Sequence, residues 1–198
     1  MNRLVKQAKN GDADAFVQLM EQNRQNMYKV AICYVNNPED AADIIQDTIL
    51  TAFEKICDLK ESRYFKTWLT RILMNKCKDF LDKRSWEVAF GELPETAYSD
   101  TALDDLLYEE LIQAVEEQYR DILVLHYVKG FKSREIAEVL GMKDATVRTR
   151  LRRGRENLCQ VYEKQMGKRK GQRKGQGESS NAAVDPMFQE RMGKYYAG

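Results

Sequence analysis

Basic and hydroxyl-bearing side chains are concentrated in the segment Ser133–Arg155, which has the sequence SREIAEVLGMKDATVRTRLRRGR. Arginine presents a planar fork of N–H donors that matches phosphate oxygens and the major-groove edge of guanine. The chemistry that these residue types can perform is therefore non-covalent binding of nucleic acid. The candidate contact residues are Ser133, Lys143, Thr146, Arg148, Thr149, Arg150, Arg152 and Arg153.

The same segment has the spacing of two short helices joined by a tight turn. Ala137 is small enough for close helix approach, and Gly141 allows the positive φ of the turn. Asp144 is predicted to cap the second helix, because its carboxylate can accept the first free amide protons. The pattern predicts a helix-turn-helix whose second helix enters the major groove of DNA. The alternative is a solvated helix hairpin inside a larger bundle.

A second group of basic and aromatic residues lies in the sequence FKTWLTRILMNKCKDFLDKR, which begins at Phe65. Basic groups hold phosphates, while aromatic rings offer stacking surfaces for unpaired bases. Aromatic residues at helical spacing more often belong to a core, which is the alternative for Trp68. The polar and aromatic residues of this group are Tyr64, Phe65, Lys66, Trp68, Arg71, Asn75, Lys78, Asp79, Lys83 and Arg84.

Helical periodicity dominates the chain and a period of two is absent, so we expect an all-α protein. Apolar spacing predicts helices over 14–35 and 65–83. Asn37 followed by Pro38 predicts the start of another helix, which continues to about residue 56, because asparagine caps a helix and proline fits its first turn. Further helices are predicted from about residue 102, with a break at Gly130.

Charge is strongly segregated along the chain, although the net charge is only +1. Residues 85–118 hold ten acidic and no Lys or Arg residues, whereas 119–170 hold fourteen basic and six acidic residues. This asymmetry predicts a polyanion-binding module that follows an acidic connecting segment. The alternative for the acidic segment is a linker whose charge serves only solubility. After Lys164 the chain is rich in Gly, Lys, Arg, Gln and Ser, a composition that predicts a disordered basic tail.

Other classes of function find little support in the composition. No apolar run is long enough to span a bilayer and no signal peptide begins the chain, so we expect a cytoplasmic protein without membrane insertion. Asp43 and Asp47 lie one helical turn apart without further clustered ligands, so we expect no enzyme, no metal and no cofactor. His126, the single histidine, is predicted to be structural. The cysteines lack metal-ligand spacing and are expected to be reduced: Cys33, Cys57, Cys77 and Cys159.

The order of these motifs resembles that of a known family. The sequence DAADIIQDTILTAFEKI is followed by FKTWLTRILMNKCKDFLDKR, an acidic linker and an arginine-rich helix-turn-helix. This order resembles bacterial RNA polymerase sigma factors, in particular the small extracytoplasmic-function (ECF) group, over about residues 10 to 160. The resemblance implies two small helical domains joined by a flexible acidic linker. They are region 2 at 1–84, the linker at 85–101 and region 4 at 102–163, before the basic tail at 164–198.

The resemblance implies core RNA polymerase and promoter DNA as partners. Region 4 would contact the −35 element through the second helix of the helix-turn-helix. Residues 58–64 and the following helix would receive a flipped base of the −10 element and contact its duplex edge. The −10 residues would be Tyr64, Phe65, Lys66, Trp68, Arg71, Asn75, Lys78, Asp79 and Arg84. The polymerase-docking residues would be Asp43, Ile44, Gln46, Asp47 and Leu50. The alternative is an ordinary amphipathic core helix, with Ile44, Ile45 and Phe53 in the core.

The expected function is therefore that of an alternative sigma factor that directs promoter-specific transcription initiation. The rival hypothesis is a conventional helix-turn-helix regulator that binds duplex DNA as a dimer, but it leaves residues 38–84 without a role. The sequence leaves open whether an anti-sigma factor binds the chain, which promoter it selects and what the basic tail does.

Overall fold

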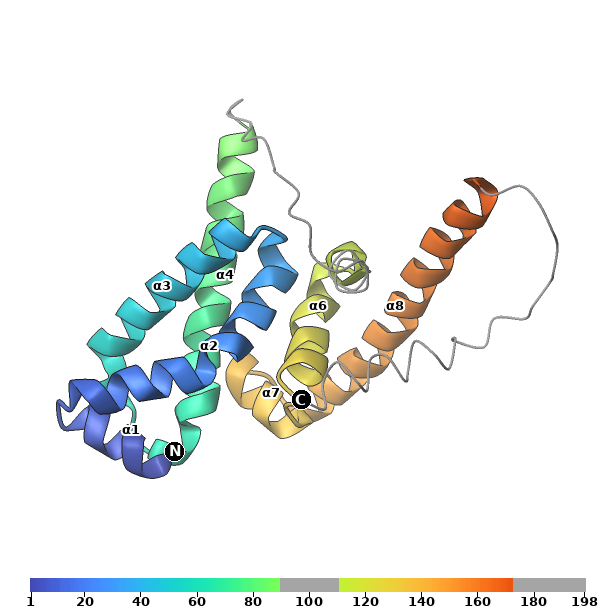
Figure 1. Ribbon diagram of the computed structural model, residues 1–198. Coiled ribbons are helices and arrows are strands. Elements are labelled where there is room, and N and C mark those ends of the chain that lie inside the picture. The colour runs from blue at the N-terminus through green and yellow to red at the C-terminus, as the bar shows by residue number, and fades with distance from the viewer. Residues whose placement is uncertain (90–110, 173–198) are drawn as a thin grey trace.

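The backbone is described for residues 1–89 and 111–172 in a computed structural model of the chain, shown in Figure 1. Within these two ranges every regular element is helical, which confirms the all-α prediction. No helix in the described part of the chain is long and apolar enough to cross a membrane.

The first range folds around three long helices that pack on one another, α2, α3 and α4 (Figure 1). Leu19 and Met27 from α2 meet Leu69 and Leu73 from α4 in a core from which solvent is excluded. The elements of this half are α1 (Asn2–Lys9), α2 (Ala13–Val35), α3 (Pro38–Lys55), the 3₁₀ turns η1 (Ile56–Asp58) and η2 (Ser62–Tyr64), and α4 (Phe65–Ala89).

The corner between α2 and α3 is fixed by two asparagines. Asn36 ends α2 in the left-handed region with a φ of 50°. The Asn37 side-chain oxygen accepts hydrogen bonds from the backbone N–H groups of Glu39 and Asp40, at 2.8 and 3.2 Å. Pro38 occupies the first turn of α3. The helix start predicted at the Asn-Pro pair is therefore confirmed.

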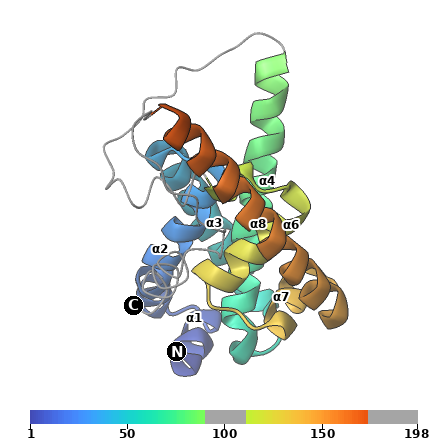
Figure 2. The same cartoon turned by 90° about the vertical axis from the view of Figure 1, so that its right-hand side faces the viewer.

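The second range packs α6 against the long helix α8, and α7 lies against α8 and the π-helical turn that follows α6 (Figure 2). Its core contains Ile112, Leu125, Ile136 and Val147, all inaccessible to solvent. The elements are α6 (Glu117–Leu123), the π-helical turn η3 (Val124–Val128), α7 (Ser133–Leu140) and α8 (Asp144–Gln172).

Gly154 allows α6 and α8 to approach closely. A Cβ atom at this position would lie 3.1 Å from Cβ of Tyr119 and 3.3 Å from Cγ of Leu123. We expect Gly154→Leu to destabilise the second half by about 1–3 kcal/mol through overpacking, measured from the urea unfolding midpoint. Arg153→Leu is the control, because it places the same side chain at an exposed neighbouring position. Equal stability of the two variants would contradict a close helix contact here.

Two helices continue past the boundaries predicted from the sequence. α4 extends to Ala89, into the predicted linker, and α8 extends to Gln172, into the predicted disordered tail. Neither extension contains proline, so the backbone hydrogen bonds of each helix can continue past the point where the apolar periodicity used for the prediction ends. The rest of the predicted linker and tail, 90–101 and 173–198, lies outside the described residues.

Candidate nucleic-acid and protein interfaces

The helix-turn-helix predicted from the sequence is present in α7 and α8. Gly141 follows α7 with a φ of 64°, and the Met142 backbone N–H donates to the Ala137 carbonyl at 3.0 Å. Ile136 and Val147 are buried where the two helices pack. This turn holds the first part of α8 on the outside of the molecule, with its polar face available to a partner.

Asp144 does not cap α8, which corrects the prediction. The backbone N–H groups of Thr146 and Val147 donate to the Lys143 carbonyl, at 2.9 and 3.1 Å, so the helix begins one residue earlier than expected. Asp144 is its first residue, and its Oδ2 lies 3.2 Å from an Arg148 guanidinium nitrogen. The carboxylate therefore orients Arg148 along the helix surface.

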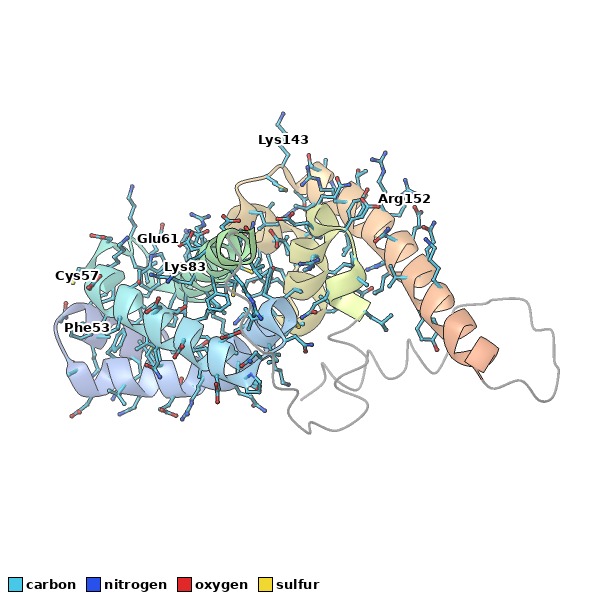
Figure 3. The ribbon with its side chains drawn as sticks, turned by 90° about the horizontal axis from the view of Figure 1, so that it is seen from above. Phe53, Cys57, Glu61, Lys83, Lys143 and Arg152 are labelled. Atoms are coloured by element: carbon cyan, nitrogen blue, oxygen red, sulfur yellow. The ribbon has the colours of Figure 1, made fainter. Side chains whose placement is uncertain are left out.

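The candidate −35 residues lie mostly on the exposed surface of α8. Figure 3 shows Lys143 and Arg152 projecting away from the body of the molecule. Arg150 is half-buried, with a guanidinium nitrogen 3.6 Å from the Met142 sulfur, and Ser133 is half-buried as well. The exposed members of the set are Lys143, Thr146, Arg148, Thr149, Arg152 and Arg153.

Arg148 and Arg152 are each held by an ion pair within α8. Arg152 lies 2.7 Å from Glu156, and both arginine side chains are 67% exposed. Exposed ion pairs of this kind contribute only about 0.2–1 kcal/mol, less than a charge-assisted bond to phosphate or a bidentate bond to guanine. Breaking these ion pairs so that the arginines can bind DNA therefore costs little free energy. Arg148 and Arg152 are four residues apart and lie on one face of the helix, so both can contact the same partner.

The aromatic residues at the start of α4 differ sharply in exposure. Phe65 is fully buried in the core, which corrects the prediction that it touches DNA. Trp68 is half-buried, with its ring centroid 6.0 Å from that of Phe65. Tyr64 is 40% exposed, and the Arg63 guanidinium lies 4.8 Å from its ring centroid. Tyr64 is therefore the accessible stacking surface of this group.

The polar −10 candidates on α4 divide into exposed and engaged side chains. Lys66, Asn75 and Asp79 are exposed. Arg84 instead forms an ion pair with Asp40 of α3 at 3.0 Å, with both side chains about a quarter exposed. That pair joins two helices of the first half, so Arg84 has a structural role in this conformation.

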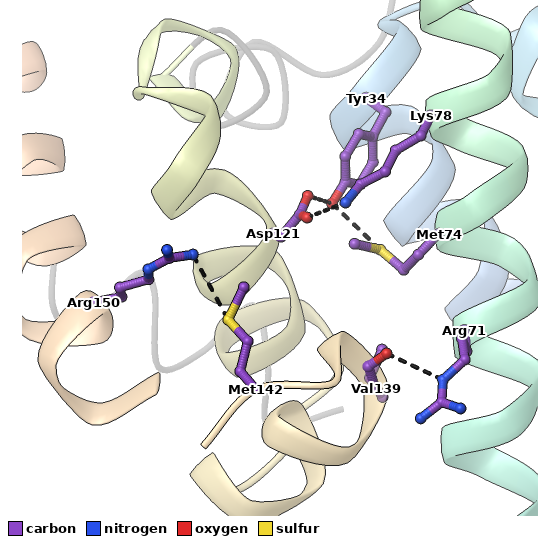
Figure 4. A network of polar contacts seen from close by, with 8 residues as sticks. All are labelled: Tyr34, Arg71, Met74, Lys78, Asp121, Val139, Met142 and Arg150. Atoms are coloured by element: carbon purple, nitrogen blue, oxygen red, sulfur yellow. Dashed lines mark hydrogen bonds and ion pairs between the residues drawn. The ribbon is translucent and has the colours of Figure 1, made fainter. Parts of the chain in front are cut away.

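Lys78 and Arg71 contact the second half of the molecule, as Figure 4 shows. The Lys78 ammonium lies 2.6 Å from Oδ2 of Asp121 on α6. The buried Tyr34 hydroxyl donates to Oδ1 of Asp121 at 2.7 Å. Burial, followed by the charge of Asp121, raises the pKa of Tyr34 well above 10. The phenol therefore stays protonated and can donate this bond at neutral pH.

Arg71 attaches α4 to the end of α7. Its Nε donates to the Val139 carbonyl at 3.1 Å, and a terminal nitrogen donates to the Glu138 carbonyl. These contacts have no signature in the sequence, because a backbone carbonyl accepts whatever side chain its residue carries. These bonds hold Arg71 and Lys78 against the second half in this conformation, and exchanging them for contacts with DNA would weaken the contact between the two halves.

The candidate polymerase-docking residues lie on α3. Asp43, Gln46 and Asp47 are exposed, and Leu50 is 62% exposed. Ile44 is only 3% exposed and belongs to the core, as the alternative for this helix predicts, so the exposed surface consists of the other four residues.

A groove of about 630 Å³ runs beside this surface between α2 and α3. Met20, Tyr28 and Ile49 supply much of its apolar lining, and Arg24 and Gln46 supply polar groups. Its lining also holds Glu21, whose carboxylate lies 3.9 Å from Arg24, so the groove itself is apolar and close to neutral, and it suits the apolar face of a helical partner.

The cysteines differ in exposure and therefore in expected reactivity. Burial, followed by the charge of Asp121, raises the pKa of Cys77 to about 12, whereas Cys57 is exposed. The thiolate is the reactive form, so we expect iodoacetamide at pH 8 to modify Cys57 in the folded protein and to spare Cys77. Peptide mass spectrometry measures both sites, and urea-unfolded protein is the control in which both react. Modification of both sites at equal rates in folded protein would contradict the burial of Cys77.

Two protein families match the chain in separate segments. Residues 19–87 match the family described as Sigma-70 region 2, and residues 105–158 match Sigma-70, region 4. The ECF RNA polymerase sigma factor SigW of Bacillus subtilis is 30% identical over 177 residues, which cover 80% of this chain and 94% of SigW. The RNA polymerase sigma factor SigV of the same organism is 32% identical over 139 residues, covering 66% of this chain and 81% of SigV.

Two solved structures share the fold. CnrH, in complex with the cytosolic domain of CnrY, superposes with a TM-score of 0.67 and 25% identity, covering 82% of this chain and 96% of CnrH. The sigma factor RpoE of Bartonella quintana, in complex with the anti-sigma factor NepR, gives a TM-score of 0.64 at 22% identity, covering 75% and 96% of the two chains. The second likeness is one of fold alone.

Proposed function

Because the chain belongs to the ECF group of RNA polymerase sigma factors, we propose that its described surfaces divide the work of promoter recognition among them. The protein is an alternative sigma factor that binds core RNA polymerase and directs promoter-specific transcription initiation. Sigma factors are non-catalytic initiation factors, and we assign no covalent reaction to this chain. The rival hypothesis of a dimeric helix-turn-helix regulator gives no role to the region 2 match.

We assign −35 recognition to α8, within a region 4 that spans about 102–163. The exposed and weakly paired arginines Arg148 and Arg152 support this assignment, since they can exchange their carboxylate partners for DNA. Lys143 and Arg153 are exposed as well and would contact phosphates that fix the position of α8 in the groove.

We assign −10 recognition to the 58–64 segment and α4, within a region 2 that begins near the N-terminus and continues through α4. Tyr64 offers a ring to an unpaired base, and Lys66 and Asn75 offer polar groups from the exposed surface of α4. Arg71 and Lys78 join this surface once their contacts with the second half are broken.

We assign polymerase docking to the exposed face of α3. Asp47 supports this best, because its side chain is 65% exposed and its ion pair with Lys76 is long, at 4.0 Å. We further propose that the protein works in the cytoplasm together with polymerase, and that an anti-sigma factor regulates it as NepR binds RpoE.

The polymerase-dependent function is tested with purified core enzyme and genomic templates. We expect transcripts from a defined promoter set only when protein and core are both present. Asp47→Arg should lower the affinity for core by about tenfold or more, because it inverts one exposed charge without disturbing packing. Glu54→Arg is the matched control, an exposed acid near the end of the same helix. Equal losses in the two variants would contradict docking at Asp47.

A further inference from the structure

Arg155 is an exposed arginine of α8 that lies beyond the residues assigned above to −35 recognition. It follows Arg148 by seven residues and Arg152 by three, so the three side chains share one side of the helix. Seven residues correspond to about 10 Å along the helix axis. The major groove is about 12 Å wide, so Arg155 can reach the phosphates at the border of the groove while Arg148 contacts bases.

The partners of Arg155 differ from those of the other two arginines. Arg148 and Arg152 each pair with a carboxylate of α8, whereas Arg155 has no carboxylate partner in the described parts of the chain. Its guanidinium lies 3.3 Å from Nε2 of His126 and 5.8 Å from the ring centroid of Tyr127. The positive charge of Arg155 is therefore not compensated, and a phosphate can bind it without first breaking an ion pair.

The imidazole of His126 is held in the orientation that accepts a hydrogen bond from Arg155. Its Nδ1 lies 3.1 Å from the Phe131 carbonyl, which can only accept, so Nδ1 carries the proton. A guanidinium can only donate, so Nε2 is the accepting nitrogen. Phe131 is buried and its backbone N–H donates to the Leu125 carbonyl at 3.0 Å. The main chain thereby fixes the ring, and the ring fixes the guanidinium.

The π-helical turn η3 supplies both rings that contact Arg155. In this turn the Lys129 backbone N–H donates to the Val124 carbonyl, five residues earlier, at 3.3 Å. The rings of His126 and Tyr127 meet edge to face, with their centroids 4.9 Å apart. The face of an aromatic ring attracts a guanidinium within about 6 Å of its centroid. Two consecutive side chains of η3 therefore hold the same arginine.

We propose that Arg155 binds a backbone phosphate of duplex promoter DNA at the border of the −35 groove, and that His126 and Tyr127 position it for this contact. The inference rests on the assignment of −35 recognition to α8, to which it adds one phosphate contact. A guanidinium has five N–H donors, so a single bond to His126 leaves donors for a phosphate. A side chain that is already positioned loses less conformational entropy when DNA binds.

The phosphate contact is tested by the salt dependence of DNA binding. The full chain is titrated onto a fluorescein-labelled duplex of about 20 base pairs with mixed sequence and followed by anisotropy, because phosphate contacts do not depend on sequence. Arg155→Gln should reduce the slope of log affinity against log salt by about 0.9, the contribution of one phosphate. Arg24→Gln is the matched control, since it removes an exposed arginine from α2 and should leave the slope unchanged.

The positioning role is tested at His126. His126→Phe keeps a ring but removes the acceptor, so it should lower the affinity about two- to tenfold by leaving Arg155 to be ordered on binding. The slope should stay at the parental value, because Arg155 is still present. His126→Gln offers an amide oxygen to Arg155 and should restore most of the affinity. His126→Phe should have no further effect in an Arg155→Gln background.

A purely structural role for these contacts predicts a different outcome. If the bond between His126 and Arg155 only fastens α8 to η3, both variants should lower the melting temperature, and Arg155→Gln should keep the parental slope. Arg153→Gln separates this inference from the −35 assignment. A reduced slope in Arg153→Gln beside an unchanged slope in Arg155→Gln would overturn the inference alone, whereas unchanged slopes in both would overturn the −35 assignment as well.

Discussion

Replacing Tyr64 with alanine should slow promoter opening by roughly tenfold or more and leave the fold intact. The ring is exposed, and base stacking on an aromatic side chain contributes about 1–3 kcal/mol. A template whose −10 region is already mismatched should restore much of the activity, because the cost of unpairing is then removed. Permanganate footprinting of the duplex and mismatched templates measures both effects.

The adjacent position provides the control. Phe65→Ala removes a ring that is fully buried, so it should lower the melting temperature without rescue by the mismatched template. Tyr64→Phe keeps the stacking surface and should open promoters almost as well as the parent. If Tyr64→Ala opens the duplex promoter at the parental rate, the ring takes no part in melting.

Asp121→Ala should loosen the contact between the two halves of the free protein. The carboxylate accepts from the buried Tyr34 hydroxyl and pairs with Lys78. Loss of a hydrogen bond to a charged group costs about 1.5–3 kcal/mol, and the half-exposed Lys78 adds little because solvent screens it. We expect a larger radius of gyration by small-angle X-ray scattering, with both halves still folded.

Two variants calibrate that result. Tyr34→Phe removes one bond but keeps the ion pair between Lys78 and Asp121, so it should expand the protein less than Asp121→Ala. Asp79→Ala removes an exposed acid from α4 and should leave the dimensions unchanged. An unchanged radius in Asp121→Ala would mean that Arg71 and apolar packing hold the halves together without this carboxylate.

The sequence predicts the helix-turn-helix well because its determinants are local. Gly141 marks a turn that needs a positive φ, and apolar residues such as Ile136 and Val147 mark the faces that become buried. The helix start at Asn37-Pro38 is equally local. The prediction that Asp144 caps α8 is wrong by one residue. The helix begins at Asp144, so this residue is the first of the helix and not its cap.

Contacts between distant segments could not be predicted in this way. Tyr34 and Asp121 are 87 positions apart, and nothing in either neighbourhood marks them as partners. Gly154 lies in an arginine-rich stretch, where only the approach of α6 explains a residue without a side chain. The exposure of Tyr64 against the burial of Phe65 depends on the direction in which α4 leaves its 3₁₀ turn, which periodicity does not determine.

The two hydrogen bonds that Arg71 donates to α7 are both accepted by the main chain. Because Arg71 donates to the carbonyls of Glu138 and Val139, most side-chain substitutions at those two positions leave both acceptors in place. Mutations in α7 that alter its outer surface are therefore largely silent for this contact, whereas any change at Arg71 removes it. Natural variation at this junction should accordingly be one-sided, with the exposed Glu138 free to vary and Arg71 constrained by the bonds that it donates.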